Sequence, residues 1–305
     1  MSENRERCDV GLKKQQGIQS VKFEEPPIIC AAASVVGQKE GDGPFGDVFD
    51  QIESDPKVGG DTWEDAEGRL QERAAELAIQ KAGCGKEAIR YIVAGDLLGQ
   101  LMASSFGLAG FDKPLFGVYG ACSTMGESIG IGSMLVEGGF ADYVLAMTSS
   151  HFASAEKQFR FPLGYANQRP KASTWTVTGS GAVVICKGDQ KQGMAKITGI
   201  TTGKIVDYGV KDTMNMGACM APAAASVVAA HFKDFGTDPS EYDQIITGDL
   251  GMVGKDILID ILRSEGYDIA DRYIDCGIEI YGRDAQAQAC LLYTSPSPRD
   301  RTRSR

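Results

Sequence analysis

The chain has 305 residues, a net charge of −10 and a hydrophobic fraction of 43%, which is the balance of a folded globular protein. The negative charge argues against a nucleic-acid-binding protein, because that class depends on a basic surface. The eight cysteines form no C-x-x-C pair and only two histidines accompany them, so we expect no metal ion and no cofactor.

The N-terminal residues 1–17 are polar and mixed in charge, and we expect them to form a polar N-terminal extension. They lack the apolar stretch of a secretory signal. No apolar run in the chain approaches the ~18–20 residues of a membrane-spanning helix. We therefore expect the chain to fold in the cytosol.

The first predicted strand is the apolar run 28–36, and the first predicted helix covers about residues 64–82. Thr62-Trp-Glu-Asp65 resembles a capping box at the start of this helix, and Gly83 is suited to end it in the left-handed conformation. Its alanines and leucines recur at helical spacing. Further apolar runs bounded by turn residues predict strands at 115–119, 143–148, 181–186 and 196–200.

An internal repeat organises the chain. Ile92-Val-Ala-Gly-Asp-Leu97 recurs 153 residues later as Ile245-Ile-Thr-Gly-Asp-Leu250, and the same offset pairs Gly83 with Gly236. A second helix is therefore expected over about 221–234, with Pro222 near its start, and a third over 254–263. The repeat divides the chain into a first half, residues 18–192, and a partial second half, residues 193–289.

Alternating strands and helices indicate an α/β protein with a sheet covered by helices on both faces. The most informative segment for chemistry is Phe116-Gly-Val-Tyr-Gly-Ala-Cys-Ser-Thr-Met125, in which a strand ends at Gly120 and a helix begins near Cys122. A thiol at a helix N-terminus lies near unpaired N–H groups, which favour the thiolate and would make Cys122 a nucleophile. The alternative is a buried and inert cysteine, and the residues alone leave both open.

Taken together, these segments resemble the stage V sporulation protein AD family of spore-forming bacteria, within the thiolase superfamily. The resemblance covers about residues 18–289. The segments that carry it include Ala33-Ser-Val-Val-Gly37, Glu40-Gly-Asp-Gly-Pro44, Tyr119-Gly-Ala-Cys-Ser-Thr124, Thr148-Ser-Ser-His151, Trp175-Thr-Val-Thr-Gly179 and Asn215-Met-Gly-Ala218. It implies a thiolase-like fold of two duplicated βαβ halves in a layered αβαβα arrangement, with the second half incomplete here.

The resemblance also implies a function. The family binds pyridine-2,6-dicarboxylic acid (dipicolinic acid) and works with the other stage V A-operon proteins to move its calcium chelate into the developing spore. A cytoplasmic fold that is peripheral at the forespore inner membrane is expected, and thiolase-like proteins usually form homodimers.

Several residues are candidates to hold such a ligand. His151 follows the predicted strand 143–148, at the edge of the sheet where α/β proteins place ligands. Downstream lie Glu156, Arg160, Arg169 and Trp175. Arginines suit carboxylates and aromatic rings suit a pyridine ring, so with Cys122 these residues form the predicted binding site. The alternatives are arginines on a solvated loop and a structural histidine.

Two rival functions stay open at this stage. In the first, the protein is an acyltransferase of the thiolase or β-ketoacyl synthase type, with Cys122 as its nucleophile, so the sequence leaves open whether it is an enzyme. In the second, it is a purely structural subunit of a membrane complex. Fold alone does not choose among these functions.

The last sixteen residues, 290–305, differ from the rest in composition. Their end is a low-complexity run of Ser, Pro and Arg. The run resembles translated sequencing-adaptor DNA, and the alternative is a disordered basic tail. We expect these residues to be non-native and the natural sequence to continue differently after Ala289.

Overall fold

The computed structural model describes residues 14–159, 175–188, 193–212 and 215–287. Its main element is a seven-stranded sheet. Six of its strands follow the order β4 (Gln51–Glu53), β3 (Ile28–Gly37), β8 (Gly179–Cys186), β7 (Tyr143–Ser150), β5 (Ile89–Asp96) and β6 (Leu115–Gly117), and β9 (Ala195–Lys196) pairs with β3. β7 is parallel to β5 and antiparallel to β8.

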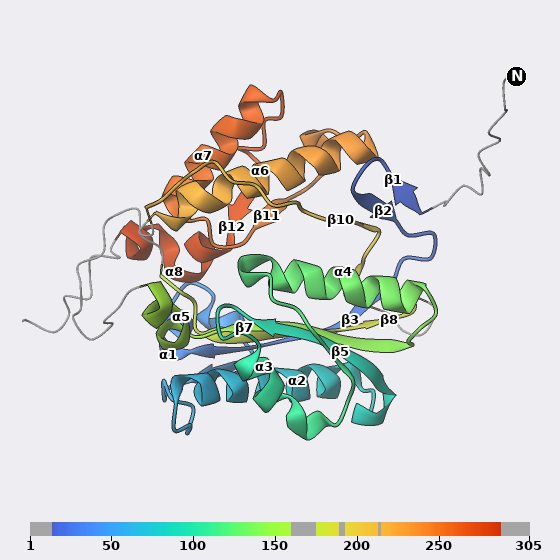
Figure 1. The fold of residues 1–305 in the computed structure, drawn as a ribbon, viewed down its shortest axis with the longest axis vertical. Helices are drawn as coiled ribbons and strands as arrows, with labels where there is room; N and C mark the ends of the chain where they lie inside the picture. Colours follow the sequence, from blue (N-terminus) through green and yellow to red (C-terminus); the bar gives the residue numbers. More distant parts are fainter. Residues whose placement is uncertain (1–13, 160–174, 189–192, 213–214, 288–305) are drawn as a thin grey trace, which may run out of the picture.

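Helices cover both faces of this sheet, as Figure 1 shows. One face carries α2 (Trp63–Ala82) and α3 (Met102–Gly107), and the other carries α4 (Thr124–Glu137). Each face has its own hydrophobic core, one around α2 and one around α4. The central strands β7 and β8 are buried along most of their length because both faces are covered.

The local signals in the sequence account for α2. The Thr62 hydroxyl accepts the N–H of Asp65 at 3.1 Å, and the chain leaves the helix at Gly83 with φ of 58°. Leu70 is fully buried in the apolar stripe that faces the sheet. The helix predicted over 64–82 is therefore confirmed to within one residue.

The second half has a separate core. It contains α6 (Met216–Phe235), the parallel strands β11 (Ile245–Thr247) and β12 (Tyr273–Asp275), α7 (Gly251–Ser264) and α8 (Cys276–Ala287). α6 and α7 approach closely where Gly217 meets Gly254, since a Cβ on Gly217 would lie 2.6 Å from the Leu250 carbonyl oxygen. α2 and α6 each have 20 residues and end at a left-handed glycine.

The start of the second helix differs from the prediction. α6 begins at Met216 rather than at 221, because the Asn215 side chain caps it by accepting the N–H of Ala218 at 3.2 Å. Pro222 consequently lies inside the helix, where its missing N–H costs one helical hydrogen bond. The third helix, α7, contains the predicted span 254–263.

A small three-stranded sheet joins the start of the described chain to the second half. It contains β1 (Gln15–Gln16), β2 (Ser20–Lys22) and β10 (Gly199–Thr201). The Asp234 carboxylate at the end of α6 accepts the N–H groups of Ile18 and Gln19 at 3.0 Å each. The single strand predicted at 196–200 is wrong, since its two ends belong to β9 and β10 in different sheets.

Two further α-helices are short: α1 (Gln38–Gly41) follows β3, and α5 (Phe152–Phe159) follows β7. Of the helices in the described ranges, none combines the length and the apolar character that a bilayer-spanning segment requires.

Candidate functional site

Cys122 lies in a tight turn between β6 and α4. Ala121 adopts a left-handed φ of 49°, and Ala121–Ser123 form a single 3-10 turn before α4 begins at Thr124. The Ser123 hydroxyl donates to the Gly120 carbonyl at 2.7 Å and holds the turn closed. The α-helix thus begins two residues later than predicted, and Cys122 precedes it rather than forming its first turn.

The thiol of Cys122 faces the second half of the molecule. Its Sγ lies 3.6 Å from the Met220 Sδ on α6. Solvent reaches the residue, yet the protein atoms around the thiol raise its pKa, and the negative charge of Asp249 raises the pKa further. This direction is opposite to the lowered pKa that a nucleophilic thiol at a helix terminus would have, because burial and the negative charge of Asp249 both disfavour the thiolate.

His151 directly follows β7 and is fully buried. Its Nε2 donates to the Pro56 carbonyl at 2.7 Å, and its Nδ1 accepts the N–H of Ala153 at 3.2 Å. A carbonyl only accepts, so these partners fix the neutral tautomer with the proton on Nε2. Burial lowers the pKa of His151 in agreement with that state. Both ring nitrogens are engaged by backbone groups.

Glu156 and Trp175 come together at the same end of the sheet. Glu156 on α5 is 1% exposed, and its carboxylate accepts the N–H of Thr176 at 3.2 Å. The Trp175 ring stacks on Phe152 at 6.2 Å between centroids. Arg160 and Arg169 lie outside the described residues.

Sequence reasoning missed a cation at this place. The Lys39 ammonium lies 3.1 Å from the centroid of the Trp175 ring and 5.4 Å from that of Tyr281. Lys39 belongs to α1, far from Trp175 in the sequence, so no local pattern predicts the pair. Ammonium groups over aromatic faces are held by the ring quadrupole, whose face is electron-rich.

A buried hydrogen bond joins the two halves beside this cation. The Tyr281 hydroxyl on α8 donates to the Glu40 carboxylate at 2.5 Å, and the N–H of Thr178 donates to the same oxygen at 3.0 Å. Burial raises the pKa of Glu40 and also that of Tyr281. The two residues are 241 positions apart, so only the folded chain shows that they meet.

The charges around these residues are mixed. Burial is the largest cause of the raised pKa values of Cys122, Cys276 and Tyr281, and the negative charge of Asp249 adds to it in all three. Lys39 supplies a positive charge over the rings of Trp175 and Tyr281. The arrangement thus combines aromatic side chains and a positive charge, with carboxylates nearby.

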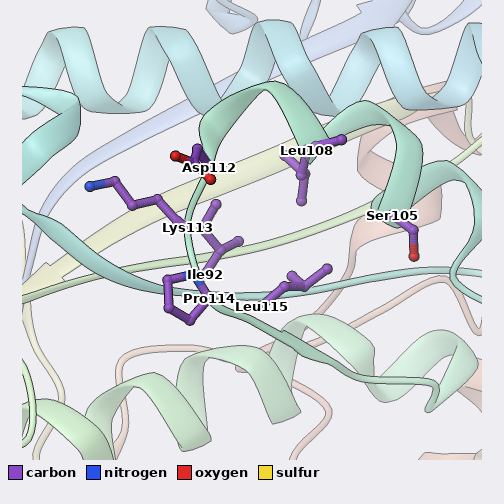
Figure 2. A pocket seen from close by; sticks show the side chains of 8 residues that line it. Ile92, Ser105, Leu108, Asp112, Lys113, Pro114 and Leu115 are labelled. Atoms are coloured by element: carbon purple, nitrogen blue, oxygen red, sulfur yellow. The ribbon is translucent and has the colours of Figure 1, made fainter.

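A separate hollow of about 430 Å³ lies between α3 and β6 (Figure 2). Its lining combines Leu108, Leu115 and Pro114 with the polar Ser105 and Lys113. Of the predicted site residues that the structure describes, none lines this hollow. It opens beside the exposed edge of the sheet, where Leu115 is 38% exposed.

The sequence of this chain matches a known protein family. A family model described as "Stage V sporulation protein AD" matches residues 17–291. Stage V sporulation protein AD of Bacillus subtilis (strain 168) is 44% identical over 276 residues, which cover 90% of this chain and 81% of that protein.

The fold of this chain matches those of solved structures. The 3-oxoacyl-[acyl-carrier-protein] synthase III from Aquifex aeolicus VF5 matches with a TM-score of 0.53 at 16% identity, over 87% of this chain and 89% of that one. Human mitochondrial 3-ketoacyl-CoA thiolase matches with a TM-score of 0.52 at 15% identity, over 88% and 91%. The predicted thiolase-like α/β fold is confirmed.

Proposed function

The chain belongs to the stage V sporulation protein AD family, and from that premise we propose that it binds dipicolinic acid and assists the uptake of this acid, as its calcium chelate, into the developing spore. The chain is a sporulation protein on a thiolase-like scaffold. Dipicolinate is a flat aromatic ring with two carboxylates, so a matching site needs an aromatic face and at least one cation.

The observation that supports this proposal is the pair formed by Lys39 and Trp175. The ammonium lies 3.1 Å from the ring centroid, so a ligand carboxylate that pairs with this ammonium would lie next to an aromatic side chain. Cys122 and Glu156 belong to the same proposed site. The proposal further assigns Arg160 and Arg169 to the ligand carboxylates, and it gives His151 the role of positioning the end of β7.

Calorimetry with dipicolinate, with and without calcium, tests the proposal. Lys39→Ala removes the cation and should weaken binding about tenfold to a hundredfold, because a charge-assisted contact contributes about 1.5–3 kcal/mol. Lys86→Ala is the matched control, since its ammonium also lies over an aromatic ring, 4.7 Å from the centroid of Phe111, but outside the proposed site. It should bind as the parent does.

The result that contradicts the site is Lys39→Ala binding dipicolinate at the parent affinity. A different result contradicts the function: no heat with dipicolinate, together with acylation of Cys122 by an acyl-CoA. That outcome would favour the acyltransferase. The raised pKa of Cys122 argues against it, as do the two histidines, each of which bonds to groups other than this thiol in the described part of the chain.

The proposal also concerns the protein's partners and its location in the cell. The protein would act with the other stage V A-operon proteins at the forespore inner membrane, as a peripheral protein. It would also form a homodimer. The exposed edge strand β6 supports the dimer, because an unpaired strand edge with apolar side chains is a ready pairing surface. Phe116 on that strand is 45% exposed.

Light scattering on the purified protein tests the dimer. Phe116→Glu should shift the mass toward the monomer, because it places a charge on the pairing edge. Phe140→Glu is the control, since Phe140 is 64% exposed but lies in the turn after α4. A parent protein that is monomeric at micromolar concentration would contradict the dimer and leave dipicolinate binding to be judged separately.

A further inference from the structure

A cluster of buried polar side chains lies between α2, α5 and the ends of β5 and β7. None of its members is more than 4% exposed, and none belongs to the proposed ligand site. Two are carboxyls, Glu67 and Asp96. The others are Gln71, Ser104, Ser149 and Ser154.

The two carboxyls have different surroundings. Asp96 accepts the N–H groups of Leu101 at 3.1 Å and Ser104 at 3.2 Å, and also the Ser104 hydroxyl at 3.1 Å. Such donors suit an ionised carboxylate. Glu67 accepts only two hydroxyls, Ser149 at 2.8 Å and Ser154 at 2.5 Å. In the described part of the chain, Glu67 makes no ion pair.

The hydrogens of the cluster are too few for its acceptors. Among the described residues the Gln71 Oε1 has no hydrogen-bond partner, while its Nε2 lies within bonding distance of three acceptors. The single hydroxyl hydrogen of Ser154 faces both Glu67 and the His151 carbonyl, the latter at 3.0 Å. With a proton on Glu67, Glu67 donates to Ser154 and leaves the hydroxyl hydrogen of Ser154 to the His151 carbonyl, which also accepts the N–H of Ala155 at 3.0 Å.

We propose that Glu67 keeps its proton in the folded protein and acts as a proton-dependent latch between α2 and α5. When the proton is lost, a second negative charge enters the buried cluster beside Asp96, and α5 moves away to admit water. α5 is the element that yields, because it is only eight residues long and is bound to Glu67 through Ser154.

The charged groups around Glu67 agree with this assignment. Asp96 on β5 and Glu64 on α2 both add negative potential, and with burial, the largest cause, they raise the pKa of Glu67 to about 7. Lys157 on α5 is paired with Glu64. His151, after β7, is neutral.

The two tryptophans of the chain report on this latch. The Trp63 ring lies 5.4 Å from that of His151, and the Trp175 ring lies 6.2 Å from that of Phe152, the first residue of α5. Tryptophan emission of the parent protein between about pH 5.5 and pH 9 should therefore show a transition centred near pH 7.

Glu67→Gln should abolish that transition, because the amide keeps a donor and an acceptor but does not ionise. Glu64→Gln is the matched control on the same helix and should keep the transition but move it to lower pH, since the charge of Glu64 adds to the burial that raises the pKa of Glu67, while the pKa of Glu64 itself is lowered. Protonation of His151 would change the emission of Trp63 only below pH 6.5, because its pKa is lowered. A transition that persists in Glu67→Gln, or is absent from the parent, overturns the proposal.

If Glu67→Gln fails to fold, a measurement on the parent protein alone still tests the proposal. Hydrogen exchange of residues 152–159, corrected for the chemical rate, should lose at least about tenfold protection between about pH 6 and pH 8. Unchanged protection over that range overturns the latch.

Discussion

Tyr281→Phe tests the hydrogen bond that joins the two halves. The substitution removes one hydroxyl and keeps the ring, so it leaves the packing of α8 intact. Glu40, which is 1% exposed, would keep the N–H of Thr178 as a donor to its carboxylate and lose the Tyr281 hydroxyl.

The expected loss follows from that contact. A hydrogen bond to a charged group contributes about 1.5–3 kcal/mol, and a buried acceptor that loses its donor does not regain water. The Tyr281 hydroxyl lowers the pKa of Glu40 against the larger effect of burial, so its removal raises this pKa further. The free energy of unfolding should therefore fall more at about pH 8 than at about pH 5.

Urea unfolding of Tyr281→Phe, Glu40→Gln and the double variant gives the coupling energy between the two groups. Tyr273→Phe is the control, because its hydroxyl bonds to Thr247 and Asp275 within the second half, and it should show no coupling to Glu40→Gln. A loss below about 0.5 kcal/mol for Tyr281→Phe with no coupling would refute the reasoning.

Four further predictions concern other parts of the molecule. The free energy of unfolding should fall by on the order of 3 kcal/mol as pH rises from 4.5 to about 7, because Glu67 keeps its proton in the folded protein and loses it in the unfolded chain. Glu67→Gln should remove this fall, and urea unfolding across that pH range measures it. Iodoacetamide should label Cys122 slowly at about pH 7.5 and much faster at about pH 9.5, as mass spectrometry of the labelled peptides can show, because its pKa is raised. Asp234→Asn should remove part of the stability that the parent loses as pH falls below about 3.8, since N–H donors lower the pKa of Asp234; acid titration followed by circular dichroism checks this. Leu70→Ala, at a fully buried position, should cost about 3 kcal/mol in urea unfolding, and a loss below about 1 kcal/mol would contradict the packing of α2 on the sheet.

Local signals predicted the elements of the fold well. The cap at Thr62 and the glycine at 83 define α2 because both act within a few residues of the helix end. The start of α6 was missed because Pro222 suggested a first turn, whereas Asn215 provides the cap. The division of 196–200 between two sheets depends on partners that are distant in sequence, and no local pattern contains them.

The candidate site was predictable only in part. The turn at Cys122 follows from its neighbours, but the pKa of its thiol is raised by burial in the fold and by Asp249, which belongs to the other half. Lys39 and Tyr281 were missed because their partners lie far along the chain. A sequence motif identifies residues of the right type, and their charge state is set by contacts that the fold creates.

The small sheet of β1, β2 and β10 constrains the order in which the chain can fold during synthesis. Ser20 and Thr201 are joined by a hydrogen bond although 181 positions separate them, and Ser20 also donates to Asp234. At roughly 5–20 residues per second, a ribosome needs about 10–40 s to make the intervening chain. The first strands to leave the ribosome therefore wait for their partners, and they are expected to dock last, after the seven-stranded sheet has formed.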